Sequence, residues 1–131
     1  MNVAALLMMA ALFGATMSER DWILVSIACG LGVSCGLYYA SSVDWYVGLS
    51  GVLHGILVYG AVRMISLGAR LGWLILAAVA VKVAWEQIAG PLPLSAATAG
   101  GDVVVDAHLY GAIAGAAAAV LGLAGRAARQ R

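Results

Sequence analysis

One octapeptide, Gly48-Leu49-Ser50-Gly51-Val52-Leu53-His54-Gly55, lies within a long apolar segment and organises the rest of the chain. Its hydroxyl, Ser50, and its imidazole, His54, are four residues apart, which places them one turn apart on the same face of a helix. The three glycines around them allow the backbones of neighbouring helices to approach closely. The octapeptide therefore predicts either a reactive centre or a small-residue packing seam with a hydrogen-bonded histidine.

The composition is that of an integral membrane protein. Of 131 residues, 64% are hydrophobic and 10% are charged, and the mean hydropathy is +1.01. This leaves too little polar surface to cover a soluble globule, so the lipid bilayer is an expected partner. The net charge is +1 and the cations are dispersed, so nucleic acid is not an expected partner. Cys29 and Cys35 lie on different faces of one expected helix and are interpreted as small packing residues.

Five apolar segments predict an all-α bundle of about five transmembrane helices in a single domain, residues 1–131. The expected helices are residues 2–17, 22–40, 45–62, 71–89 and 103–124. Trp45 and Tyr46 are expected at a water–membrane interface, and the prolines of Gly90-Pro91-Leu92-Pro93 end the fourth helix. The first helix spans about 24 Å, which is short of the roughly 30 Å hydrocarbon core.

The basic residues predict the orientation. If the helices alternate across the bilayer, all of the following fall on one side: Arg20, Arg63, Arg70, Arg126, Arg129 and Arg131. The opposite loops, 41–44 and 90–102, contain no Lys or Arg, so the arginine side is expected in the cytoplasm. Ser50 and His108 then lie roughly 8 Å below the outer surface, each about five residues into its helix.

This shared depth predicts a catalytic Ser50–His108 dyad. An imidazole on a neighbouring helix can act as the base for a serine nucleophile once small residues let the helices approach. The small residues are Gly51, Gly55, Gly111 and Gly115. Asp106 precedes His108 by two residues and points about 200° away around the helix, so it is not expected to complete a triad.

Three segments, in chain order, resemble a known family. They are Tyr46-Val47-Gly48-Leu49-Ser50-Gly51-Val52-Leu53-His54-Gly55, Lys82-x-x-Trp85-Glu86-Gln87 and Val104-Val105-Asp106-Ala107-His108-Leu109-Tyr110-Gly111. Together they resemble the rhomboid intramembrane proteases and, among these, the rhombosortase branch. The resemblance runs from about Asn2 to the C-terminus. Gly-x-Ser-Gly alone recurs in soluble hydrolases, whereas the three segments together are specific.

The resemblance implies an intramembrane serine endopeptidase with a rhomboid-like helical bundle and no metal or other cofactor. Ser50 would attack the scissile carbonyl and His108 would take its proton. The implied substrates are transmembrane proteins that end in a Gly-Gly motif, a transmembrane helix and a short basic tail. The implied location is the bacterial inner membrane, with the active site facing the periplasm. Glycines suit this reaction because they loosen a helix and expose a peptide carbonyl.

The resemblance also implies supporting residues. His54 stands where many rhomboids carry an aromatic residue packed on the catalytic histidine, so it is expected to orient His108; the alternative is a core imidazole bonded to a carbonyl one turn back. Lys82 and Glu86 are one turn apart and are expected to form an ion pair, structural by default or in contact with substrate. Asp106 is expected to bond Lys82 or to face a water cavity. The supporting glycines are Gly48, Gly55 and Gly111.

The chain departs from the family at its beginning. Rhomboids have six helices, with a His and an Asn on the second that help to hold the oxyanion, whereas this chain has no His before His54. The expected oxyanion donors are therefore the backbone N–H groups of Ser50 and Gly51 together with Asn2, and the loss of one side-chain donor typically costs ~10²–10³ in rate. We expect that the first of the usual six transmembrane helices is missing by N-terminal truncation and that this form is weakly active or inactive.

Three other functions are compatible with the same residues. A catalytically impaired rhomboid-like membrane protein would bind transmembrane helices without cleaving them. A haem between helices would use His54 and His108 as axial ligands and would leave the serine motif unused. An ion or proton path would use Lys82, Glu86 and Asp106.

Overall fold

The computed structural model describes residues 2–41, 43, 46–93 and 103–129. These residues form five α-helices and no β-strand: α1 (Asn2–Phe13), α2 (Glu19–Ala40), α3 (Ser50–Ser66), α4 (Leu71–Ala89) and α6 (Val105–Arg129). The predicted all-α bundle is thus confirmed. Trp45, parts of the loops 41–44 and 90–102, and Arg131 lie outside the described residues.

Three of the described helices, α2, α4 and α6, are long and apolar enough to cross a membrane. The other two are apolar but shorter: α1 has 12 residues and α3 has 17. At ~1.5 Å per residue they span about 18 and 26 Å, compared with roughly 30 Å for a hydrocarbon core. The chain is a helical membrane bundle in which two of the five expected spans are short.

A capping box at Ser18 sets the boundary between α1 and α2. The Ser18 hydroxyl accepts a hydrogen bond from the backbone N–H of Asp21 at 3.2 Å, and the Asp21 carboxylate accepts one from the Ser18 N–H at 3.0 Å. This reciprocal pair satisfies two amide donors at the start of a helix. Consequently α2 begins at Glu19 and not at residue 22. α1 ends at Phe13 and not at residue 17.

Two glycines limit α3. Gly48 has a φ of +156°, a backbone conformation that other residues rarely adopt, so the helix begins at Ser50 and not at residue 45. Gly68, with a φ of +82°, follows the other end, and α3 ends at Ser66 and not at residue 62. The prediction that Ser50 lies about five residues into its helix is therefore wrong, because Ser50 is the first residue of α3.

The last two helices differ less from prediction. α4 begins at Leu71 and ends at Ala89, as expected, and Gly90 follows it with a φ of +81°. α6 begins at Val105 and ends at Arg129 instead of spanning 103–124. Its C-terminal extension contains Ala127 and Ala128, which are strong helix formers and favour continuation of the helix.

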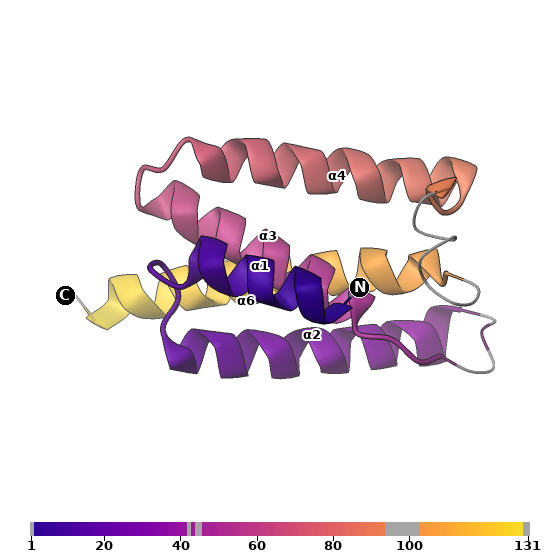
Figure 1. Cartoon of the computed structure of the whole chain (residues 1–131). Helices are drawn as coiled ribbons and strands as arrows, with labels where there is room; N and C mark the ends of the chain where they lie inside the picture. The colour runs from indigo at the N-terminus through magenta and orange to yellow at the C-terminus, as the bar shows by residue number, and fades with distance from the viewer. Residues whose placement is uncertain (1, 42, 44–45, 94–102, 130–131) are drawn as a thin grey trace.

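α3 is the central helix of the bundle. It contacts α1, α2, α4 and α6, and Figure 1 shows α1 in front of it, α4 above it and α2 below. Phe13 of α1 is completely buried against α3, where a Cβ added to Gly60 would lie 2.7 Å from its ring. The octapeptide that contains Ser50 and His54 is thus carried by a helix that the other helices surround.

The arginines mark one end of the bundle and Ser50 marks the other. Arg20 lies at the start of α2, Arg63 near the end of α3, and Arg126 near the end of α6 (left side of Figure 1). At the opposite end α3 and α6 begin and α4 ends. The helices therefore alternate in direction, as the predicted orientation requires.

A buried polar cluster joins three helices at the arginine end. Asp21 of α2 is 9% exposed and accepts hydrogen bonds from the Tyr59 hydroxyl and from Arg126, each at 2.7 Å. Arg126 also donates to the Tyr59 oxygen at 2.9 Å. Because a buried charge is tolerated only when it is paired and hydrogen-bonded, this cluster fixes how α2, α3 and α6 meet at the end remote from Ser50.

Candidate active site

Ser50 and His108 meet where α3 and α6 begin. The Nε2 atom of His108 lies 3.1 Å from the Oγ atom of Ser50, and His108 is 3% exposed. Ser50 is the first residue of α3 and His108 is the fourth of α6, so both belong to the first turn of their helices. The structure therefore brings the two residues of the expected dyad within hydrogen-bonding distance.

Paired glycines explain why α3 and α6 approach so closely. A Cβ added to Gly111 would collide with the carbonyl of Gly51, and one added to Gly115 would collide with the carbonyl of Gly55. A Cβ on Gly51 would in turn lie 2.6 Å from the carbonyl oxygen of Ala107. Since any side chain here would push the helices apart, this glycine seam sets the distance between Ser50 and His108.

Glu86 of α4 contacts the other ring nitrogen of His108. Its Oε2 atom lies 2.8 Å from His108 Nδ1, and its Oε1 atom lies 2.6 Å from the Nζ atom of Lys82. Sequence reasoning paired Glu86 with Lys82 but missed its contact with His108. A signal for that contact was present, because Glu86 lies three residues before the end of α4, close to the bundle end where α3 and α6 begin.

The partners of His108 define the tautomer of its neutral ring. A carboxylate only accepts hydrogen bonds, so Nδ1 of His108 carries the hydrogen and donates it to Glu86. The lone pair of the neutral ring is then on Nε2, which faces the Ser50 hydroxyl. This is the arrangement in which an imidazole can take the proton of a serine nucleophile.

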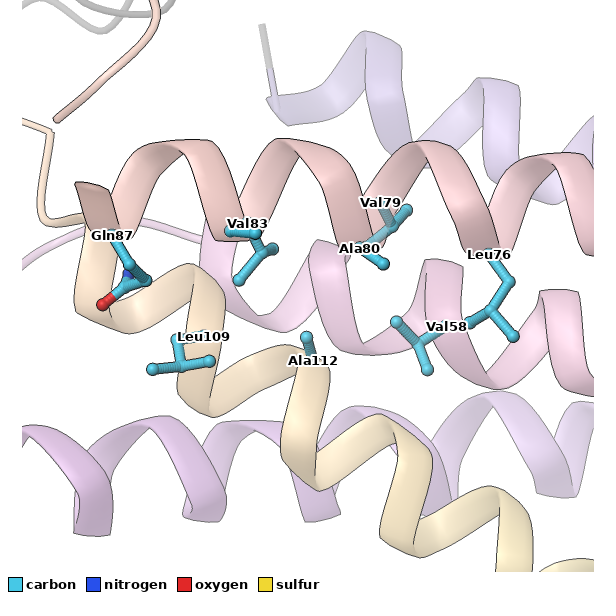
Figure 2. A pocket seen from close by; sticks show the side chains of 9 residues that line it. Val58, Leu76, Val79, Ala80, Val83, Gln87, Leu109 and Ala112 are labelled. Atoms are coloured by element: carbon cyan, nitrogen blue, oxygen red, sulfur yellow. The ribbon is translucent and has the colours of Figure 1, made fainter. Parts of the chain in front are cut away.

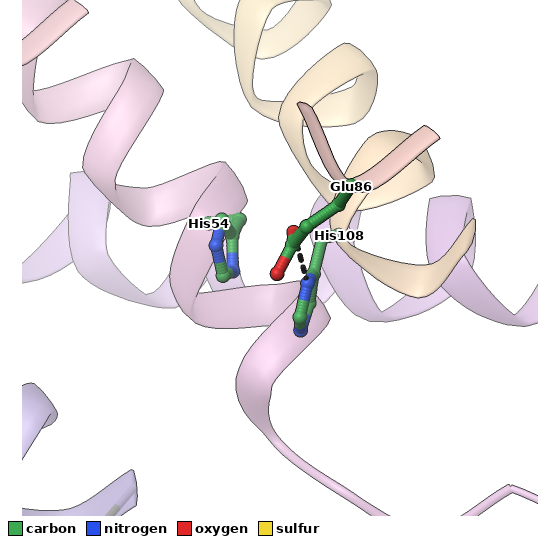
Figure 3. A group of neighbouring side chains, drawn as sticks. All are labelled: His54, Glu86 and His108. Atoms are coloured by element: carbon green, nitrogen blue, oxygen red, sulfur yellow. Dashed lines mark hydrogen bonds and ion pairs between the residues drawn. The ribbon is translucent and has the colours of Figure 1, made fainter. Parts of the chain in front are cut away.

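His54 lies against the face of the His108 ring (Figure 3). The two ring centroids are 4.1 Å apart with an interplanar angle of 20°, and Nδ1 of His54 donates to the carbonyl oxygen of Ser50 at 2.7 Å. The geometry thus combines both roles considered for His54, as a stacking partner and as an imidazole bonded one turn back. One side chain braces the ring of His108 and the backbone of Ser50 together.

The N-terminus of α3 offers hydrogen-bond donors beside the hydroxyl. The Leu53 N–H makes the first bond of the helix, to the Leu49 carbonyl at 3.0 Å. The N–H groups of Ser50 and Gly51 precede it and have no partner within the helix, and Leu49 provides no side-chain cap. Together with the positive end of the helix dipole, these groups can stabilise an oxyanion that forms next to Ser50.

Two other predicted site residues make no hydrogen bond to this group among the described residues. Asn2 is the exposed first residue of α1, and no hydrogen bond among the described residues joins it to Ser50. Asp106 accepts a hydrogen bond of 3.3 Å from the Ser41 hydroxyl instead of one from Lys82, whose ammonium is paired with Glu86. Asp106 therefore connects the start of α6 with the end of α2.

Three side chains of the site are close enough to be considered as metal ligands. His54, Glu86 and His108 offer ligand atoms within 4.8 Å of one another. However, the lone pair of an imidazole nitrogen lies in the plane of its ring, and the planes of these two stacked rings are nearly parallel, so the lone pairs do not converge on one ion. Both oxygens of Glu86 also already have partners. Rings stacked 4.1 Å apart also leave no room for a porphyrin between them, which argues against bis-histidine haem ligation. The arrangement fits acid–base chemistry better than ligation.

An apolar cavity of about 300 Å³ lies beside the site, among α3, α4 and α6 (Figure 2). Its lining is hydrocarbon apart from Gln87: Val58, Leu76, Val79, Ala80, Val83, Ala84, Gln87, Leu109 and Ala112. Neither Ser50 nor His108 lines it. The cavity is therefore not the place where the chemistry occurs.

Comparison with known proteins adds a family match. The family model described as Rhomboid domain matches residues 1–125. No curated protein and no solved structure matches the chain. The matched range includes Ser50, Glu86 and His108 and nearly the whole of the 131-residue chain, so the match concerns the helical bundle as a unit and not one short motif.

Proposed function

Because the chain belongs to the rhomboid family of intramembrane serine proteases, we propose that it is a serine endopeptidase with Ser50 as nucleophile and His108 as base. The observation that carries this proposal is the 3.1 Å contact between His108 Nε2 and Ser50 Oγ. A packing seam needs only the glycines, whereas this pair presents a hydroxyl to the lone pair of a fixed imidazole.

The proposed reaction follows from the donors and acceptors around Ser50. Its Oγ atom bonds to the scissile carbonyl carbon while its proton moves to Nε2 of His108, and the carbonyl π electrons move onto oxygen. The N–H groups of Ser50 and Gly51 stabilise that oxyanion. The oxyanion electrons then re-form the carbonyl as the C–N bond breaks, and the imidazolium gives its proton to the leaving amine. Water next attacks the acyl carbon while His108 takes its proton, and the ester C–O bond breaks as that proton passes to the Ser50 oxygen.

The proposed substrates are membrane proteins with a Gly-Gly motif, a transmembrane helix and a short basic tail. The likeness of the three sequence segments to rhombosortases supports this substrate class. The alternating helices support it too: a basic tail stays in the cytoplasm with the arginines, which leaves the Gly-Gly motif at the Ser50 end. The proposed location is accordingly a bacterial inner membrane, with Ser50 facing the periplasm.

A membrane reporter tests this substrate class. We expect a reporter that ends in Gly-Gly, a transmembrane helix and a basic tail to be cut near Gly-Gly, and an Ala-Ala version to be cut roughly 30-fold more slowly. Two alanines favour the intact helix by about 2 kcal/mol, which hides the carbonyl. Mass spectrometry of the released fragment locates the cut. Equal cleavage of the two reporters would contradict the Gly-Gly preference.

Cysteine labelling tests the proposed orientation. In a background that lacks Cys29 and Cys35, an impermeant maleimide added to spheroplasts should label a cysteine placed at Thr98 and spare one placed at Leu67, because the arginines favour the cytoplasm. Lysed cells, in which both positions should react, provide the control. The reverse pattern would place Ser50 on the cytoplasmic side and refute the periplasmic location.

A further inference from the structure

The carboxylate of Glu86 joins Lys82 to His108, and this bridge has a use in the proposed reaction. We propose that Glu86 is a positioning residue that orients His108 and stabilises the protonated form of His108, with Lys82 as the fixed counter-charge of Glu86. This role rests on the proposed function. It would extend the Ser50–His108 pair to a hydrogen-bonded series of three side chains from three helices, α3, α6 and α4.

The burial of Glu86 shows that its contact with His108 is part of a built site. Glu86 is 1% exposed, whereas the side chain of Lys82 is 28% exposed. A carboxylate this deeply buried requires partners for both oxygens, and a pair within α4 alone would satisfy only one. The second oxygen instead accepts from His108 on α6 at 2.8 Å. Lys82 neutralises the carboxylate from the more open side.

The chemistry assigns two effects to this contact. Before the reaction, the carboxylate keeps the hydrogen of the neutral ring on Nδ1, so Nε2 is free to accept the Ser50 proton. When that proton arrives at Nε2, His108 becomes an imidazolium, and Glu86 remains ionised beside it. The proton on Nδ1 stays on His108 throughout. Glu86 thus opposes the positive charge that develops while the oxyanion forms.

The position of Glu86 excludes direct contact with substrate. A side chain that is 1% exposed cannot touch a peptide bound at Ser50, so Glu86 acts through His108. The contact also depends on where α4 lies. The neighbouring Gln87 donates to the Val105 carbonyl at 3.4 Å, so two adjacent residues hold the end of α4 against the start of α6. α4 therefore orients His108, the base of the proposed reaction.

Amide substitution tests this role in purified protein. We expect Glu86→Gln to lower kcat for the Gly-Gly reporter by about 10²–10⁴ with KM unchanged, because an amide can donate to Nδ1 and stabilise the wrong tautomer. Glu86→Asp keeps the charge and should recover part of the lost kcat. Glu19→Gln makes the same change at an exposed position near the start of α2 and should behave as wild type. Thermal unfolding in detergent shows that each variant is folded.

A double variant separates positioning from a structural ion pair. If Glu86 serves only to neutralise Lys82, then Lys82→Met/Glu86→Gln, which has no unpaired charge, should regain the wild-type kcat. We expect it to remain as slow as Glu86→Gln. The double variant also decides the question if Glu86→Gln alone does not fold. Wild-type kcat in either folded variant would overturn the inference. Cleavage by Ser50→Ala in the same assay would instead refute the proposed function.

Discussion

Ser50→Ala and His108→Ala should each abolish cleavage of the Gly-Gly reporter, because nucleophile and base act as a unit and neither works without the other. Ser50→Ala removes a single oxygen from the first residue of α3, and the glycine seam that holds α3 against α6 is untouched. Protein amount and thermal unfolding should therefore stay at wild-type values for Ser50→Ala. The loss would then lie in the chemistry and not in the fold.

A fluorophosphonate probe tests whether His108 activates the Ser50 hydroxyl, and it needs no substrate. The probe should label the wild-type protein, fail to label Ser50→Ala, and label His108→Ala far more slowly, because the hydroxyl is reactive only when a base takes its proton. Ser34→Ala, which changes an exposed serine of α2, is the matched control and should label as wild type. Cleavage retained by Ser50→Ala would end the serine-protease proposal. A folded wild-type protein that neither labels nor cleaves would favour a rhomboid-like protein that binds helices without cutting them.

The composition and the helix-ending prolines predicted the fold well, but local capping interactions and glycine backbone conformations determine where the helices begin and end. The apolar segments and the prolines after Ala89 were enough to predict five helices and the limits of α4. The other helix ends depend on local backbone geometry, which the hydropathy of the sequence does not predict. Ser18 and Asp21 start α2 early through a capping box, and the backbone of Gly48 delays α3 until Ser50.

The candidate site was predictable where it depends on helix order, on depth or on spacing along one helix, and less so where it depends on how a helix is rotated about its axis. Helix order and depth were enough to pair Ser50 with His108, even though the assumed start of α3 was wrong. The spacing of Lys82 and Glu86 likewise predicted their ion pair. The contact between Glu86 and His108 was missed because it depends on how α4 is rotated against α6, and packing sets that rotation. For Asp106 the sequence left two alternatives open, a bond to Lys82 or a water cavity, and did not indicate its hydrogen bond with Ser41.

Gly111→Ala should lower cleavage of the Gly-Gly reporter by about 10²-fold, although it adds only one methyl group. The added Cβ would overlap the carbonyl of Gly51, which is backbone and cannot rotate away as a side chain can. α6 must then move away from α3 and carry His108 with it. Overpacking of this kind typically costs about 1–3 kcal/mol in stability, and a displacement of about 1 Å at the reacting atoms can cost ~10² in rate.

Gly125→Ala provides the control on the same helix. A Cβ at Gly125 meets nothing within 4 Å, so alanine there should leave cleavage unchanged and, through its higher helix propensity, stabilise α6 by up to about 1 kcal/mol. Thermal unfolding and reporter cleavage, measured on both variants, separate the effect of a methyl group on helix stability from its effect on the contact between α3 and α6. Full cleavage by Gly111→Ala would show that the glycine seam does not set the distance between His108 and Ser50. A selective loss at Gly111 would mean that the reactivity of Ser50 depends on the absence of a side chain one turn along the helix from His108.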